Sequence, residues 1–187
     1  MNTSTIVLIV IAGLLVLLAF YVIGVYNKLV NARNKVDNQF SQVDIQLKRR
    51  ADLIPNLVET VKGYATHEKE TFDAVISARA KAMSANTKED EMKASGELTQ
   101  ALGRLMAISE AYPELKANTN FVSLQNSLQE TEDKIAYARQ FYNDAVLNYK
   151  NKIEMFPSNI VAGMFNFKAE PFFEAEEAAK EVPKVQF

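Results

Sequence analysis

The side chains of this chain that are best suited to acid–base chemistry are His67, Glu68 and Tyr64. Histidine and glutamate transfer protons in many enzymes, but they must converge on one substrate atom to do so. His67 and Glu68 are adjacent, so on a helix they point to different faces. An enzyme built on these three residues would need a water-accessible pocket beside them. We consider that hypothesis weaker than a structural, hydrogen-bonding role for His67.

Few other residues of the chain are of types or at spacings that could catalyse a reaction or bind a metal ion. The chain has one His and no Cys, and it has no glycine-rich phosphate loop and no paired carboxylates at helical metal-ligand spacing beside a His. We therefore expect no enzymatic activity, no cofactor and no metal ion. A formal net charge of -2 also gives no reason to expect nucleic-acid binding.

Arg50 is the most informative charged residue, because Val43 and Leu57 are its neighbours in a seven-residue apolar pattern. A charge at a buried position requires a partner of opposite sign. If the two long helices of the chain are antiparallel, Arg50 lies at the level of Ile135, and Glu132 is the expected partner. Two further carboxylates lie close by, Glu130 and Asp133. The alternative is that Arg50 reaches solvent along its aliphatic stem.

Two long amphipathic segments position these residues. Apolar residues recur at heptad spacing in both segments, which is typical of helices that pack along a stripe, as in a coiled coil. The first stripe contains Leu29, Val36, Val43, Leu57, Phe40, Leu47, Ile54 and Val61, and the second contains Phe121, Leu128, Ile135, Tyr142, Tyr149 and Phe156.

Shorter helices are expected between the two long segments. Residues 63–65 indicate a turn, Thr66 is a candidate cap of a helix that reaches about residue 85, and Thr87 with Asp90 has the spacing of a capping box. Pro113 is expected to end the third helix, and Asn120 to cap a fourth that runs to about residue 155. Four helices with short connections predict an antiparallel up-down bundle.

Pro55 interrupts the first amphipathic segment. Inside a helix, proline removes one amide donor and collides with the carbonyl four residues earlier, at a cost of about 3 kcal/mol. The heptad phase continues through Pro55, so we expect a bend there and not a turn. A hinge or a ligand-binding notch is the alternative interpretation.

Residues 6–25 form an uncharged apolar run of the length that spans a bilayer as one helix. A cleaved signal peptide would have basic residues before a shorter apolar core and a small-residue cleavage site, and these features are absent. Lys28, Arg33 and Lys35 follow the run, which favours a short extracytoplasmic N-terminus and a cytoplasmic body. Gly13 is a small residue that can support contact between membrane helices.

The chain is therefore predicted to be all-α. We expect an extracytoplasmic N-terminus at residues 1–5, a transmembrane helix at 6–25, a helical bundle at 26–157, in which the first and last helices are long, and a C-terminal segment at 158–187. That last segment mixes phenylalanines with glutamates. We expect its first phenylalanines to pack on the bundle and the rest to be mobile, with a partner-docking peptide as the alternative.

Over nearly its whole length the chain resembles the LemA family of bacterial membrane-anchored proteins. The matching segments are YNKLV at 26–30, RN at 33–34, LKRRADLIPNLV at 47–58, VKGY at 61–64, HE at 67–68, AR at 78–79, SEAYPELKAN at 109–118, RQFYN at 139–143 and FPSN at 156–159. The resemblance implies a membrane helix followed by an antiparallel helical bundle. It implies no established reaction and no catalytic residue, and a magnetosome protein similar to the family is tied to building a membrane compartment.

Together these features favour a non-enzymatic, single-pass scaffold on the lipid bilayer. It would present helical surfaces to copies of itself, as a homo-oligomer, or to an unknown membrane or cytoplasmic protein. An extracytoplasmic sensor or ligand-binding bundle is the second hypothesis, and it requires the opposite orientation in the membrane.

Overall fold

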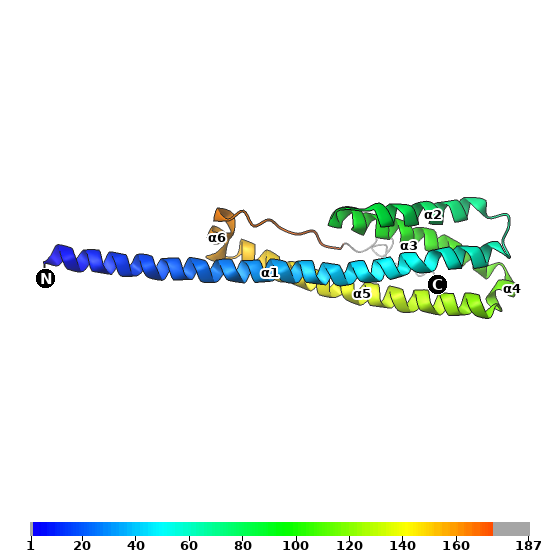
Figure 1. The fold of residues 1–187 in the computed structure, drawn as a ribbon, viewed down its shortest axis with the longest axis horizontal. Coiled ribbons are helices and arrows are strands. Elements are labelled where there is room, and N and C mark those ends of the chain that lie inside the picture. The colour runs from blue at the N-terminus through cyan, green and yellow to red at the C-terminus, as the bar shows by residue number, and fades with distance from the viewer. Residues whose placement is uncertain (1, 174–187) are drawn as a thin grey trace, which may run out of the picture. The chain divides into compact units, whose positions relative to one another are not determined.

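The computed structural model describes residues 2–173, and these residues form helices and no strand. The predicted mobility of the rest of the C-terminal segment, and its alternative as a partner-docking peptide, concern residues 174–187, which lie outside the described residues. The predicted all-α class is confirmed. Six helices follow one another in this order: α1 (Thr3–Lys62), α2 (Lys69–Ser84), α3 (Lys88–Glu110), α4 (Pro113–Lys116), α5 (Thr119–Glu154) and α6 (Ser158–Met164) (Figure 1).

The described chain divides into two compact units. Unit 1 consists of residues 2–39 and 142–170, and unit 2 consists of residues 40–141 and 171–173. The helices α1 and α5 each belong to both units, because α1 continues past residue 39 and α5 begins before residue 142. The predicted domain boundaries at residues 26 and 157 stay a prediction.

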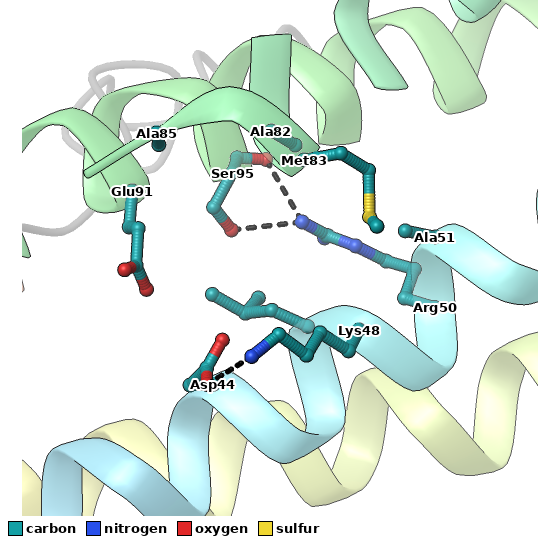
Figure 2. A pocket seen from close by; sticks show the side chains of 10 residues that line it. Asp44, Lys48, Arg50, Ala51, Ala82, Met83, Ala85, Glu91 and Ser95 are labelled. Atoms are coloured by element: carbon teal, nitrogen blue, oxygen red, sulfur yellow. Dashed lines mark hydrogen bonds and ion pairs between the residues drawn. The ribbon is translucent and has the colours of Figure 1, made fainter. Parts of the chain in front are cut away.

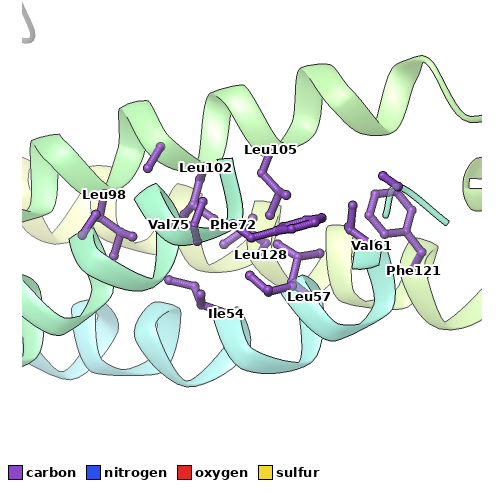
Figure 3. Close-up of a cluster of buried hydrophobic side chains, with 14 of the residues drawn as sticks. Ile54, Leu57, Val61, Phe72, Val75, Leu98, Leu102, Leu105, Phe121 and Leu128 are labelled. Atoms are coloured by element: carbon purple, nitrogen blue, oxygen red, sulfur yellow. The ribbon is translucent and has the colours of Figure 1, made fainter. Parts of the chain in front are cut away.

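Unit 2 has one apolar core to which all four of its long helices contribute (Figure 3). Ile54, Leu57 and Val61 come from α1, while α2 supplies Phe72 and Val75. Further members come from α3, from α4 and from the first half of α5: Leu98, Ala101, Leu102, Leu105, Leu115, Phe121 and Leu128. The helices are joined by short connections, as in an up-down bundle.

Unit 1 has a smaller core. Leu29 of α1 is buried together with Val161 and Ala162 of α6, and Phe167 packs against them.

Of the phenylalanines of the C-terminal segment that were expected to pack, Phe173 is buried in unit 2. Its ring stacks on the ring of Phe40, with centroids 6.4 Å apart.

The apolar run is confirmed as the first part of a continuous helix. Among residues 2–173, α1 is the one helix long and apolar enough to cross a membrane, with a mean hydropathy of 3.2 over its most apolar window. None of that window is buried in the protein. A helix whose whole surface is apolar and unburied requires an apolar environment, which a bilayer supplies.

The helix ends are partly as predicted. Thr87 caps α3, because its Oγ1 accepts a hydrogen bond from the Asp90 amide at 3.1 Å. The expectation for Thr66 was wrong: α2 begins at Lys69 after Glu68, and a side-chain cap is lacking there. At α5 the cap is Asn118 and not Asn120, since the Asn118 carbonyl oxygen accepts from the amides of Asn120 and Phe121 at 2.9 and 3.0 Å.

The predicted apolar stripes are buried except at Leu47, which is half-buried, and at Phe156. Val36, Val43 and Val61 of α1 are inaccessible to solvent, as is Tyr142 of α5. Phe156, expected to continue the stripe of α5, is exposed, because α5 ends at Glu154.

Candidate functional site

A buried arginine occupies the centre of unit 2. Arg50 of α1 is only 1% exposed, so the alternative in which it reaches solvent is wrong. Its Nη1 donates to Glu132 Oε1 at 3.2 Å and to Thr99 Oγ1 at 3.0 Å. Its Nη2 donates to Ser95 Oγ at 2.8 Å and to the Ser95 carbonyl at 3.2 Å. The structure thus joins Arg50 to the carboxylate that the heptad register selects, and it adds two hydroxyl groups from α3.

A second arginine converges on the same serine. Arg139 Nη2 donates to Ser95 Oγ at 2.7 Å, so this oxygen accepts from two guanidinium groups on different helices. Sequence reasoning did not identify Ser95, Thr99 or Arg139. A signal was present, because Ser95 and Thr99 are four residues apart among the apolar residues of α3, where small polar side chains face a predicted buried charge.

The network connects α1, α3 and α5 through one cation. Removing an ion from water costs several kcal/mol, and this cost is offset only when the charge is paired and its donors are bonded. Arg50 meets this requirement with four of its five donor hydrogens, while its Nε has no hydrogen-bond partner among residues 2–173. Any shift of α3 or α5 along α1 would leave the guanidinium unpaired, so the network fixes the register of the three helices.

A cavity of about 190 Å³ adjoins the network (Figure 2). Its polar lining comes from Asp44, Lys48 and Arg50 of α1 and from Glu91 and Ser95 of α3. Asp44 and Lys48 are paired with each other at 2.7 Å. Glu91 Oε2 is buried and has no hydrogen-bond partner within the described part of the chain.

Burial is the main reason that the pKa of Glu91 is raised above its ordinary value. The negative charge of Asp44 raises the pKa further, and Lys48 lowers it. The cavity therefore holds a carboxyl group that resists ionisation beside a cation that is already paired.

Pro55 lies inside α1, which continues through it to Lys62. The carbonyl that proline deprives of its helical partner is that of Ala51, four residues earlier. Arg79 of α2 replaces the missing donor, because its Nε donates to the Ala51 oxygen at 2.7 Å. Pro55 is thus an attachment point for α2, and this bond gives it a structural role that requires neither a hinge nor a ligand.

His67, Glu68 and Tyr64 do not converge. His67 is exposed in the connection before α2 and makes no hydrogen bond or ion pair with the described residues, so the hydrogen-bonding role predicted for it is not found there. The Tyr64 hydroxyl instead accepts from Asn118 Nδ2 at 2.9 Å. Gly13 lies in the apolar run, where an added methyl group would meet no atom within 4 Å.

Ser95 Oγ acts as a hydrogen-bond acceptor in unit 2. Serine attacks a carbonyl only when an adjacent base removes its proton, and the side chains that contact Ser95 Oγ are two guanidinium groups that donate to it. Among residues 2–173, His, Asp and Glu side chains do not gather in any group of three that could hold a metal ion.

The model of the LemA family matches residues 39–187, which include Arg50, Pro55, Ser95 and Glu132. The chain belongs to the LemA family.

Proteins similar in sequence to this chain carry two kinds of name. Magnetosome protein MamQ 1 of Paramagnetospirillum magneticum is 29% identical over 179 residues, a match that covers 82% of this chain and 66% of that protein. Protein LemA of Metamycoplasma hominis is 25% identical over 159 residues, covering 84% of this chain and 73% of that protein. MamQ of Magnetospirillum gryphiswaldense is 26% identical with the same coverage as the first. The chain therefore spans just under two thirds of the length of the MamQ proteins.

We predict that Glu132→Gln destabilises this LemA chain by about 2 kcal/mol or more, since it leaves the buried Arg50 without a countercharge. The expected loss is below the roughly 3 to 5 kcal/mol of a fully buried pair, because the Glu132 side chain is 31% exposed. Urea unfolding of the full chain in detergent, followed by circular dichroism, measures it.

Glu130→Gln is the matched control, because Glu130 pairs with Lys134 and Arg49 on the surface. Exposed pairs contribute little, so its unfolding midpoint should stay close to that of the unmodified chain. Equal midpoints for the two variants would show that Arg50 does not depend on Glu132.

Glu91 predicts a pH dependence of stability. Because the pKa of Glu91 is higher in the folded chain than in the unfolded chain, the folded state holds this proton more tightly, and stability decreases as pH rises from 4.5 through the folded pKa. Glu91→Gln should therefore raise the unfolding midpoint at pH 7 and leave it unchanged near pH 4.

Glu97 provides a control of opposite sign. Its pKa is lowered by the hydrogen bond and the charge of Lys81, so its contribution is present above pH 4.5 and is lost as pH falls. Glu97→Gln should reduce the midpoint slightly at neutral pH. A Glu91→Gln gain that is the same at pH 4 and pH 7 would contradict the assignment.

Proposed function

We propose that this LemA-family chain is a non-enzymatic scaffold anchored in the bacterial inner membrane, with its helical body in the cytoplasm. The body presents fixed helical surfaces to other copies of the chain or to a partner protein. The buried Arg50 network supports this proposal, because it fixes the helices of unit 2 in one register and uses its polar groups internally.

The observation that carries the proposal is a pair of aromatic side chains on the outer surface of α5. Tyr137 is 64% exposed and Phe141 is 58% exposed. They are four residues apart, so they lie on the same side of the helix, one turn from each other. Large aromatic groups contribute strongly to protein interfaces, and here a rigid helix holds two of them in water.

The membrane assignment rests on the apolar part of α1 and on the basic residues that follow it. Lys28, Arg33 and Lys35 favour retention of the body on the cytoplasmic side. Gly13 adds a place where two membrane helices can approach closely, since its surface is open. The relatives named magnetosome proteins are compatible with a role in organising a membrane structure.

A ligand-binding bundle on the opposite side of the membrane is the second candidate, and the cavity beside Arg50 is the observation in its favour. We rank it lower for two reasons. Sites for small molecules usually enclose about 300 to 1,000 Å³, whereas this cavity has about 190 Å³. Its charged groups also have partners on the protein already, apart from Glu91 Oε2 and Arg50 Nε.

A single experiment on Phe141→Cys tests both the surface and the side of the membrane. The chain has no other Cys, so a thiol cross-linker reports on this position alone. In intact cells we expect a membrane-permeant bifunctional reagent to produce cross-linked dimers or adducts with a partner. Pretreatment with a membrane-impermeant thiol reagent should not block them.

Lys69→Cys on α2 is the control, because it is exposed but lacks aromatic neighbours of this kind. It should react with the permeant reagent and remain monomeric. Cross-linking that is equal at both positions, or absent at both, would refute a specific α5 surface. Blocking by the impermeant reagent would refute the cytoplasmic orientation and favour the second candidate.

A further inference from the structure

The short helix α6 packs against α1 at the end of its apolar run. Val161 and Ala162 of α6 are buried with Leu29, and Val22 and Val25 pack on the same cluster. Val22 and Val25 belong to the last turn of residues 6–25. Since a helix rises 1.5 Å per residue, the cluster begins within that apolar run and extends only about 6 Å past its end.

Aromatic contacts place the residues after α6 beside Tyr26, at the end of the apolar run of α1. The Phe165 and Phe167 rings lie 4.8 and 5.7 Å from the ring of Tyr26, which directly follows the apolar run. The Arg33 guanidinium lies 5.4 Å from the centre of the Phe167 ring. Aromatic side chains with a nearby cation are typical of the boundary between lipid and water.

The outer surface of this region is apolar and exposed. Residues 155–167 carry no charge, and the acidic residues of the C-terminal segment begin only at Glu170. Phe156 is 79% exposed, Met164 68% and Ile160 55%, and Met155 and Phe165 are exposed as well. A water-soluble surface rarely gathers large apolar side chains in this way unless something covers them.

We propose that α6 and its flanking residues lie in the membrane interface, with Phe156, Ile160 and Met164 in contact with lipid. The inference rests on the proposed membrane anchor. If residues 6–25 span the hydrocarbon core, a helix packed on Val22 and Val25 is held at the surface of that core. The lipid partner follows from this continuity with the spanning helix, and the bilayer covers the apolar face.

Basic residues of unit 1 fit the same boundary. Lys28 and Lys35 of α1 and Lys152 of α5 line one hollow, and none of the three forms an ion pair with the described residues. Lysines just beyond a spanning helix extend toward lipid phosphates. In this proposal the chain contacts the membrane at two places. The helix α1 crosses the hydrocarbon core of the bilayer, and α6 lies at the surface of that hydrocarbon core.

Spin labels at single cysteines test the proposal in the full chain. Ile160→Cys and Met164→Cys carry a nitroxide, with Leu15→Cys in the apolar run and Ile76→Cys on α2 as controls. All four positions are exposed on the protein, so folding should not be disturbed. The chain is reconstituted in vesicles of phosphatidylethanolamine and phosphatidylglycerol, and collisions with oxygen and with a water-soluble nickel chelate are measured.

We expect the labels at 160 and 164 to collide preferentially with oxygen, at a depth of about 5 to 10 Å, between the deeper label at 15 and the aqueous label at 76. Nickel collisions at 160 and 164 as frequent as at 76, with the label at 15 still in lipid, would overturn the inference and leave the anchor intact. Nickel access at 15 would overturn both.

Spin–spin broadening tests whether a second copy of the chain covers the apolar face of α6 in place of lipid. Broadening at 164 that disappears when labelled protein is diluted with unlabelled protein would show that a second copy covers this face, and would overturn the lipid assignment. Spectra at 160 and 164 that do not change on dilution, together with preferential oxygen collisions, support it.

Discussion

One buried guanidinium sets the conditions that unit 2 must satisfy. Arg50 is enclosed by α1, α3 and α5, and its hydrogen bonds end on Glu132, Ser95 and Thr99. Apolar side chains tolerate small slips between helices, whereas a buried charge does not, because its partners lie at fixed points. Burial of the apolar core is the main favourable contribution to folding. Arg50 adds specificity, because its hydrogen bonds can form in only one of the helix registers that the apolar core would permit.

Another arginine, Arg79, attaches α2 to α1. Pro55 would ordinarily weaken α1, yet the carbonyl it frees at Ala51 accepts a hydrogen bond from Arg79 of α2. The two attachment points, at Arg50 and at Ala51, are consecutive residues on α1. Together they fix α2, α3 and α5 against one turn of that helix. In the scaffold that we propose, such a body would hold the exposed Tyr137 and Phe141 of α5 in fixed positions.

Heptad periodicity in the sequence predicts which residues of two long helices meet. Contacts that also depend on the position of a third helix cannot be predicted from that periodicity. Heptad spacing places Arg50 in an apolar stripe and selects Glu132, because both follow from the register of two helices. Ser95 and Arg79 escape prediction, since their positions depend on how α2 and α3 dock. Capping shows the same limit: Thr87 has a complete local motif, while Asn118 was missed because the preceding turn at Pro113–Lys116 is itself a short helix.

The parts of α1, α3 and α5 that surround Arg50 in unit 2 should behave as one cooperative body. Hydrogen exchange of the full chain in vesicles tests it most directly, because helices that open together share one opening free energy. We predict that amides near Arg50, Ser95 and Glu132 exchange at closely similar opening free energies, and that Arg50→Met separates them. Faster, independent exchange of α3 in the unmodified chain would contradict the claim.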